Sequence, residues 1–353
     1  MKVSNFDFEL PAELIATHPL DRRDASRMLV VKPTPALAAG AEPDDKVLSI
    51  QDSLISDSLI TDFISHLRAG DVVVFNNSKV IPARFNATAP SGKVYEITLH
   101  TNKNENIWFG FAKQFNKLNI GDILILDDEK TQIKIISKND DSGLELEFLC
   151  DDVFAVLDRV GKMPLPPYMH RDEESDDRDR YQTVYAETLG SMAAPTAGLH
   201  FTPELIAAIQ AAGAKVVNIT LHIGAGTWLP VKSDDTSDHK MHSEFGIITP
   251  DQMEIINSAR RVIAIGTTSL RLLESANHKA FNGATNIFIT PGYKFNTVDV
   301  LLTNFHLPKS TLFMLVSAFA GLPEMKAAYA HAVAERYRFF SYGDCCLLFK
   351  KEN

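Results

Sequence analysis

Cysteine is scarce in this chain of 353 residues, which has only Cys150, Cys345 and Cys346. Two of the three are adjacent and no Cys-x-x-Cys occurs, so neither a disulfide framework nor a zinc ribbon can be built. Long apolar runs are also missing. The longest, residues 311–321, is well short of the ~20 residues that cross a bilayer, and the first residues contain no signal-peptide core. We therefore expect a protein of the reducing cytoplasm with no membrane partner.

Positive charge is in deficit, because 35 Lys and Arg stand against 45 Asp and Glu, for a net charge of −10. Affinity for nucleic acid comes largely from neutralising phosphates, so this balance argues against a protein coated in nucleic acid. It leaves room for a local basic face. Much of the acidity lies in residues 172–177, which we expect to be a solvated loop. Cations gather in three places, at Arg22, Arg23 and Arg27, at Lys79, Arg84 and Lys93, and at Arg336 and Arg338.

The hydrophobic pattern predicts two kinds of structure. Short alternating runs separated by Gly, Asn and Asp are typical of a small antiparallel barrel or sandwich, and they occupy residues 72–75, 94–99, 123–126 and 144–148. After residue 153, strands alternate with helices. We predict an α/β main domain, a mixed, barrel-like sheet with flanking helices, from residues 1–64 and 156–353. A small antiparallel β-barrel of residues 65–155 is inserted into it, and residues 33–46 form a surface loop.

Several element boundaries can be predicted in the second half. Thr202 before Pro203 and Thr249 before Pro250 are expected to cap helices. Buried strands are expected at residues 215–222 and 261–265. The second strand runs into residues 266–269, which we expect to cap a helix beginning at Leu270. A strand, a polar turn and a helix start, in this order, place a ligand at a helix N-terminus.

Small residues, threonines and histidines crowd residues 193–202 and 221–227. Small residues let a ligand approach the backbone, and Thr and His supply hydrogen bonds and proton transfer. Gly224 and Gly226 form either a tight turn after a strand or a close approach to a nucleoside. They lack the third glycine of a dinucleotide fingerprint, so no nicotinamide cofactor is expected. The other candidates here are Thr196, His200, His222 and Thr227.

Two more polar clusters, residues 266–271 and 303–308, complete what resembles a composite active site. Arg271 is poorly placed for the helix dipole, so we expect an anion or a carboxylate beside it. The candidates in these clusters and just beyond are Thr267, Thr268, Ser269, Arg271, Glu274, Asn304 and His306.

Histidine and glutamate at short spacing raise the question of a metal. His239, His242 and Glu244 would need a further ligand and supporting hydrogen bonds, so we predict no metal site. Near the end, residues 336–344 interleave cations with aromatic rings, as nucleic-acid surfaces do. We expect Phe339 and Phe340 to pack into the core as part of a strand. The sequence does not decide whether Tyr342 and Asp344 pack in the core or bind a substrate.

Eleven motifs, in their order along the chain, indicate a resemblance to a known family. They are residues 8–11, 76–84, Gly92 and Lys93 with Glu96, 161–168, 181–185, 193–202, 221–227, 239–244, 266–271, 304–308 and 339–344. Through them the chain resembles, nearly end to end, the S-adenosylmethionine:tRNA ribosyltransferase-isomerase family of queuosine biosynthesis. The family usually has Asn-Asp-Thr where this chain has Asn76, Asn77 and Ser78, so an amide replaces a carboxylate at residue 77.

The resemblance implies an α/β domain with an inserted β-barrel and a transfer with an uncommon donor. The ribosyl part of S-adenosylmethionine moves to the aminomethyl group of 7-aminomethyl-7-deazaguanine at the tRNA wobble position. The sugar is rearranged, adenine and methionine leave, and epoxyqueuosine-tRNA is formed. S-adenosylmethionine is a co-substrate, with no bound prosthetic group and no metal. We expect a cytoplasmic monomer.

This chemistry asks for a base for a C5′ proton, an acceptor for the amine proton, a donor to the leaving adenine and an anion site with an acidic partner. The resemblance and the motifs together suggest His200, His222, Glu244 and His306 as catalytic residues. The sequence does not select the base among them. The substrate-binding candidates are Arg84, Lys93, Glu96, Thr196, Gly224, Gly226, Thr227, Thr267, Thr268, Ser269, Arg271, Glu274, Asn304, Tyr342 and Asp344.

Two other classes of protein stay open at this point. One is a metal-dependent hydrolase built on the histidines, which chelator sensitivity would reveal. The other is a tRNA-binding protein without activity, which release of adenine from S-adenosylmethionine would exclude.

Overall fold

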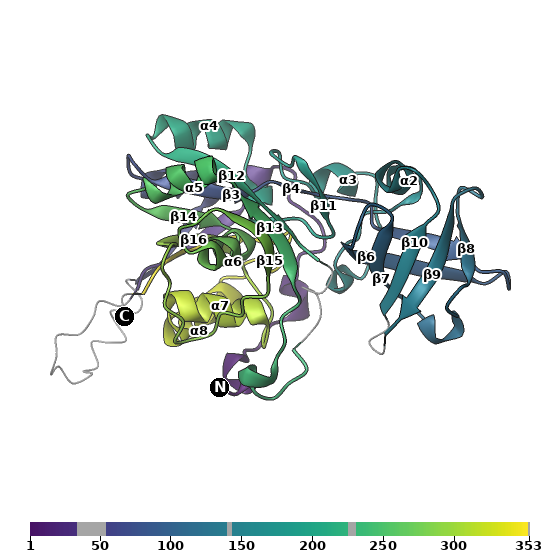
Figure 1. The fold of residues 1–353 in the computed structure, drawn as a ribbon. Coiled ribbons are helices and arrows are strands. Elements are labelled where there is room, and N and C mark those ends of the chain that lie inside the picture. The colour runs from purple at the N-terminus through teal and green to yellow at the C-terminus, as the bar shows by residue number, and fades with distance from the viewer. Residues whose placement is uncertain (34–53, 140–142, 225–230, 352–353) are drawn as a thin grey trace.

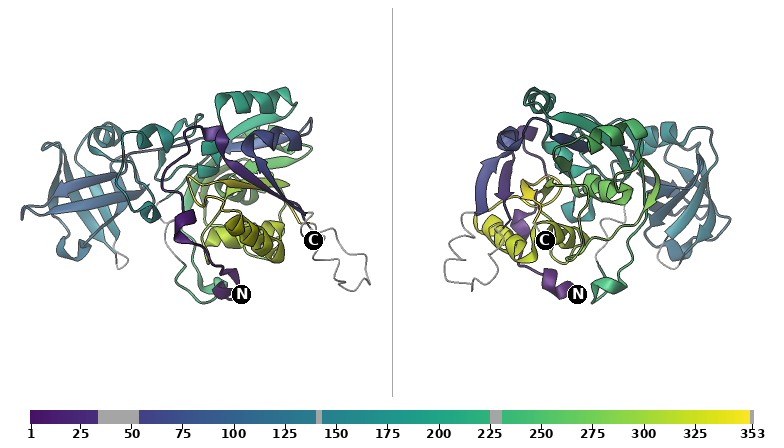
Figure 2. Two further views of the ribbon diagram at one scale, coloured as in Figure 1. Left: turned by 180° about the vertical axis from the view of Figure 1, so that it is seen from behind. Right: turned by 60° about the vertical axis from the view of Figure 1, so that its left-hand side comes forward.

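The computed structural model describes residues 1–33, 54–139, 143–224 and 231–351. They form a larger body of helices and sheet and a smaller β-barrel that projects from one side of it (Figures 1 and 2). Of the predicted surface loop, residues 33–46, only Pro33 lies within the described residues, and Gly226 and Thr227 also lie outside them. Among the described residues, no helix is long and apolar enough to cross a membrane.

A nine-stranded mixed sheet forms the centre of the larger body. In spatial order the strands are β15 (Phe281–Thr285), β13 (Glu244–Ile248), β12 (Lys215–His222), β3 (Val72–Asn76), β14 (Val262–Ile265), β16 (Val300–Asn304), β17 (Cys345–Phe349), β1 (Arg27–Val31) and β2 (Ile55–Leu59). The four inner strands β12, β3, β14 and β16 are parallel, so their carboxyl ends meet at one edge, where ligands bind in such sheets.

Side chains of the sheet alternate between two cores, as the pleat of a strand requires. Val72 and Val74 of β3 pack in the core that contains helices α5 (Pro250–Asn257), α6 (Thr267–Ala276), α7 (Thr311–Ala320) and α8 (Leu322–Ala334). Val73 and Phe75 pack in the opposite core, with α4 (Pro203–Ala211) and the 3-10 helix Ile60–His66. The helices therefore cover both faces of the sheet.

Two predicted helix starts are confirmed. Thr202 accepts a hydrogen bond from the Leu205 amide at 3.2 Å, and Thr249 accepts one from Gln252 at 3.3 Å, in each case before a proline.

The third predicted helix start, in residues 266–269, is wrong in its register. Helix α6 begins at Thr267 instead of Leu270, because Gly266, at a φ of 88°, turns the chain directly from β14 into the helix. The Ser269 hydroxyl donates back to the Ile265 carbonyl at 2.8 Å instead of capping the helix.

The smaller body is a closed six-stranded antiparallel barrel, within the predicted insertion of residues 65–155. Its strands, in spatial order, are β10 (Gly143–Phe148), β7 (Ile107–Ala112), β6 (Val94–Asn102), β5 (Arg84–Thr88), β8 (Ile123–Leu126) and β9 (Gln132–Lys138). The predicted fold class, an α/β domain with a small antiparallel barrel, is thus confirmed.

Residues 72–75 do not belong to the barrel, contrary to the prediction. They lie in β3, where every side chain is buried between the two cores. A short apolar run of this kind cannot be assigned to one sheet or another from its pattern alone.

Short elements join the two bodies (Figure 1). Strands β4 (Ser78–Val80) and β11 (Thr188–Ser191) form a parallel pair, and helices α2 (Val153–Val160) and α3 (Asp177–Arg180) follow the barrel.

The aromatic pair near the end of the chain packs as expected, but in another secondary structure. Phe339 and Phe340 belong to the large core, so that prediction is confirmed. Phe339 forms an isolated bridge with Ile15 and the strand begins later, at Cys345.

Candidate active site

A cavity of about 360 Å³ lies beyond the carboxyl ends of β14 and β16. Its wall combines residues from seven of the eleven motifs that the sequence singles out, which are far apart along the chain. Because the inner strands are parallel, their ends bring these segments to one edge. The predicted residues that line the cavity are Thr196, Thr267, Thr268, Arg271, Asn304 and His306.

Arg271 is the charged group of this wall that is most deeply buried, with 3% of its surface exposed. Its Nη1 donates to Glu244 Oε2 at 2.5 Å, so Glu244 is the carboxylate partner that the sequence calls for. The Nε and Nη2 atoms are buried without a hydrogen-bond partner. An arginine with one edge paired and donors left over can bind a carboxylate from the cavity.

His200 is connected to the cavity through Asn304. Its Nδ1 lies 2.9 Å from Ser26 Oγ and its Nε2 lies 3.1 Å from Asn304 Nδ2. The Asn304 amide nitrogen also faces the Asp344 carbonyl at 3.4 Å, and its oxygen accepts from Thr196 Oγ1 at 2.9 Å. This orientation makes Nε2 the acceptor, which puts the His200 proton on Nδ1. His200 therefore holds Asn304 and Thr196 in the wall without lining it.

His306 is the histidine in the wall itself. Its Nε2 lies 3.0 Å from Thr303 Oγ1, and its main-chain N–H donates to the Tyr329 hydroxyl at 2.9 Å. Burial lowers the pKa of its ring to about 3, so the imidazole is neutral across the working range of most proteins.

His222 lies apart from the cavity, at the end of β12. A Cβ on Gly190 would come within 3.0 Å of its ring, so Gly190 leaves the space that the imidazole occupies. Burial lowers the pKa of His222, and its Nδ1 has no hydrogen-bond partner. Neither His200 nor His222, both predicted as catalytic residues, lines this cavity.

Acid should destabilise the protein through its buried neutral histidines. Burial lowers the pKa of His200 to about 4 and that of His306 to about 3, from 6.5. Below pH 6.5 these histidines bind protons in the unfolded chain but stay neutral in the native protein. The free energy of unfolding that is present above pH 6.5 is therefore lost as the pH falls. We expect a loss of roughly 2 kcal/mol per histidine by about pH 5.

Denaturant unfolding at a series of pH values measures this loss. The variant His306→Gln should show a smaller decrease in unfolding free energy between neutral pH and about pH 5 than the wild type. Parallel curves for the two proteins would show that His306 protonates as readily in the native state as in the unfolded chain.

Glu274 lies outside the wall of the cavity, which corrects its predicted role beside the donor. Its Oε1 accepts the amides of Thr297 and Val298 at 3.0 Å each. Its Oε2 accepts the Asn296 amide at 2.9 Å and the Tyr293 hydroxyl at 3.3 Å. The carboxylate thus fixes the chain before β16.

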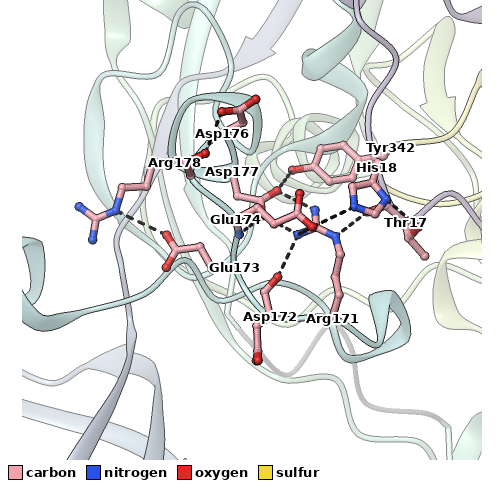
Figure 3. Close-up of polar contacts among 11 residues, drawn as sticks. Thr17, His18, Arg171, Asp172, Glu173, Glu174, Asp176, Asp177, Arg178 and Tyr342 are labelled. Atoms are coloured by element: carbon pink, nitrogen blue, oxygen red, sulfur yellow. Dashed lines mark hydrogen bonds and ion pairs between the residues drawn. The ribbon is translucent and has the colours of Figure 1, made fainter.

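The acidic run and Tyr342 meet in a buried polar network (Figure 3). Asp177 is 3% exposed, so the predicted solvated loop is wrong at this residue. It accepts two hydrogen bonds from Arg171, at 2.6 and 2.8 Å, and one from the Tyr342 hydroxyl at 3.0 Å. Asp344 accepts the amides of Arg27 and Arg338, at 2.9 and 2.8 Å. Tyr342 and Asp344 are therefore engaged within the protein.

The predicted substrate-binding residues of the barrel lie away from the first cavity. Arg84 and Glu96 line a second cavity, of about 720 Å³, where the barrel meets residues 165–172. Arg84 Nη2 donates to the Leu165 carbonyl at 2.9 Å. Lys93 bonds to Gln114 and its Nζ lies 4.8 Å from the ring of Tyr95.

Sequence reasoning missed several residues of the first cavity. Tyr168, Tyr181 and Lys309 line it, and Ser26 supports it through His200. Tyr168 and Tyr181 lie in motifs that carry the family resemblance, which was a usable signal. Among the described residues, no three His, Cys, Asp or Glu side chains are grouped to hold a metal.

The fold and the cavity define a class, an α/β protein that can bind a small polar substrate beside an inserted barrel. The family model of queuosine biosynthesis proteins matches residues 3–348, and the chain belongs to this family. The family resemblance predicted from the motifs is thereby confirmed, and the chain is an enzyme, a transferase and isomerase.

Similar proteins carry a more specific name. The S-adenosylmethionine:tRNA ribosyltransferase-isomerase of Parvibaculum lavamentivorans is 47% identical over 99% of this chain and 99% of its own. That of Mesorhizobium japonicum is 47% identical over 100% of this chain and 99% of its own. The crystal structure of S-adenosylmethionine tRNA ribosyltransferase from Thermotoga maritima has a TM-score of 0.53 and 32% identity, covering 98% and 99% of the two chains.

Proposed function

We propose that the enzyme transfers and isomerises the ribosyl moiety of S-adenosylmethionine onto 7-aminomethyl-7-deazaguanine at the tRNA wobble position. The products are epoxyqueuosine-tRNA, adenine and methionine. The activity named for the similar proteins supports the reaction. The observation that carries it is Arg271, a buried guanidinium whose Nε and Nη2 have no partner at the wall of a cavity of about 360 Å³.

Arg271 gives the donor a defined orientation. The carboxylate of the methionine end binds the two free N–H donors, while Glu244 holds the opposite edge of the guanidinium at 2.5 Å. Glu244 is thus a positioning residue, which keeps Arg271 aimed at the cavity. The negative charge of Glu244 also compensates Arg271 in the free enzyme, when no donor is present.

The threonines and His306 lie where the nucleoside part of the donor would go. Thr268 Oγ1 is buried without a partner, so it is available to a ribose hydroxyl or a ring nitrogen. The sulfonium acidifies the C5′ protons of the donor, and a base must remove one. His306 is our candidate, because its ring lines the cavity and one nitrogen of a neutral imidazole can accept a proton.

Turnover of a defined RNA tests the proposal. Purified protein, S-adenosylmethionine and tRNA bearing 7-aminomethyl-7-deazaguanine should give epoxyqueuosine in the digested tRNA by mass spectrometry, with one adenine released for each. RNA binding without adenine release would favour a protein without activity. A requirement for added metal or nicotinamide would overturn the proposal of S-adenosylmethionine as sole co-substrate. We also propose that the enzyme acts as a cytoplasmic monomer.

The barrel of the insertion, residues 65–155, is proposed to hold RNA. Three cations lie at its start, and Lys79 is exposed on β4 in a chain of net charge −10. The variants Lys79→Ala, Arg84→Ala and Lys93→Ala should each weaken tRNA binding and reduce the slope of log Kd against log salt by about one unit. Lys103→Ala is the control, because this barrel lysine already pairs with Glu145. Unchanged slopes at all three positions would refute the assignment.

A further inference from the structure

Three arginines from distant parts of the chain gather on the far side of His200 from Asn304. Arg23 and Arg180 line a small hollow together with Ser26 and His200. Arg338 is near enough that its charge, like that of Arg23, helps to lower the pKa of His200, after the larger effect of burial. The hollow holds about 20 Å³, room for about one oxygen atom of a ligand.

None of these three arginines has a carboxylate partner among the ion pairs of the described residues. Arg23 donates to the carbonyls of Leu199 and Asp179, at 3.4 and 2.8 Å. Arg180 donates to the carbonyl of Asp21 at 3.1 Å and to that of Leu20, and Arg338 donates to that of His18. The guanidiniums are therefore held in place by backbone oxygens, and not by direct ion pairs with carboxylates of the described residues.

Two donors are left over in this cluster. Arg180 Nε and Arg338 Nη1 are buried and have no hydrogen-bond partner. Burial also lowers the pKa of Arg23 and that of Arg338, and the charge of Asp344 partly opposes this shift at Arg338. The nearby carboxylate of Asp344 is bonded to the amides of Arg27 and Arg338, not to a guanidinium. Such a site is prepared for an anion from outside.

We propose that the Arg23, Arg180 and Arg338 cluster binds a backbone phosphate of the RNA acceptor, a proposal that rests on the proposed function. The guanidiniums of Arg23 and Arg180, which line the hollow, suit a phosphate, whose oxygens accept from several donors at once. In a chain of net charge −10, a local basic site is what attracts a polyanion.

The location of the cluster indicates which phosphate of the RNA it would bind. Ser26 and His200 line the hollow, and His200 Nε2 is 3.1 Å from Asn304, which lines the cavity proposed for S-adenosylmethionine. A single imidazole thus separates the two sites. The bound phosphate is therefore one that lies close to the modified nucleotide, and its binding is transmitted to the donor cavity through His200 and Asn304.

The test measures binding of an anticodon stem-loop bearing 7-aminomethyl-7-deazaguanine, by fluorescence anisotropy at several KCl concentrations. Arg180→Gln and Arg338→Gln should each weaken binding about tenfold and reduce the salt slope by about 0.7 to 0.9. Arg178→Gln is the matched control, because this neighbour in α3 pairs with Asp158 and Glu173. It should keep the slope of the wild type.

Lysine substitutions separate charge from folding. Arg180→Lys and Arg338→Lys keep the charge and should keep most of the slope, which a damaged fold would not do. Slopes equal to the wild type in both glutamine variants would overturn the proposal. So would a wild type whose melting temperature rises with inorganic phosphate while the variants bind RNA normally, since the site would then serve a free anion.

Failure of the proposed reaction can be distinguished from failure of the proposed phosphate site. A wild-type protein that binds the stem-loop but releases no adenine contradicts the proposed function. The binding slopes still decide whether the arginine cluster contacts the RNA, because they require no turnover.

Discussion

Arg271→Gln is expected to lower kcat/KM for S-adenosylmethionine by about 30- to 4000-fold. Removing one member of a buried, hydrogen-bonded charge pair costs about 2 to 5 kcal/mol, and each 1.4 kcal/mol is about tenfold. Here the lost groups are the Nε and Nη2 donors, which have no partner within the protein. Steady-state kinetics with tRNA held at saturation measure the effect.

A second variant separates binding from folding. Arg271→Gln alone leaves Glu244, at 3% exposure, buried without a counterion, which should cost about 3 to 5 kcal/mol of stability. In the double variant Glu244→Gln with Arg271→Gln both charges are gone, so stability should recover while kcat/KM stays low. Recovery of kcat/KM together with stability would mean that Arg271 serves only Glu244.

The variant His200→Gln is expected to slow single-turnover conversion by about 100-fold or more. His200 fixes the amide of Asn304, which in turn accepts from Thr196, and a displacement of about 1 Å in a reacting group can cost 100-fold. The matched control is His222→Gln, which should stay within about threefold, a margin far below the effect of losing a general base. Thermal melts of both variants check that they fold.

The pH profile distinguishes the two roles that His200 could have. Burial lowers the pKa of His200 to about 4, so a positioning role leaves the shape of the profile unchanged in the variant and lowers it uniformly. Loss of the acidic limb, where the rate falls as the base becomes protonated, would instead identify His200 as the base. If both variants turn over within about threefold of wild type, the histidines are structural and the assignment of this network is wrong.

Much of the candidate site could be predicted because strand ends are readable in a sequence. Gly266 follows a buried strand and Asn304 is the last residue of another, and parallel strands bring such ends to one edge. The pairing of Arg271 with a carboxylate followed from its place in the first turns of a helix.

The partner of a buried polar group could not be predicted in the same way. The Tyr342 hydroxyl donates a hydrogen bond to Asp177, which is 165 residues away in the sequence, and no local sequence pattern predicts such a contact. The assignment of residues 72–75 failed for a related reason, because strand partners are chosen by packing on both faces. The partners of Glu274 could not be predicted either, because they include backbone N–H donors, which every residue but proline possesses.

Strand β17 has a consequence for how the protein is made. It is the last strand of the sheet in chain order, yet it lies between β16 and β1. During synthesis, β1 and β2 leave the ribosome long before β17. Residues 28–31 can therefore pair with residues 345–348 only at the end of synthesis. A message cut short before this point therefore yields a chain with an open sheet edge, which is a substrate for proteases and not a weaker enzyme.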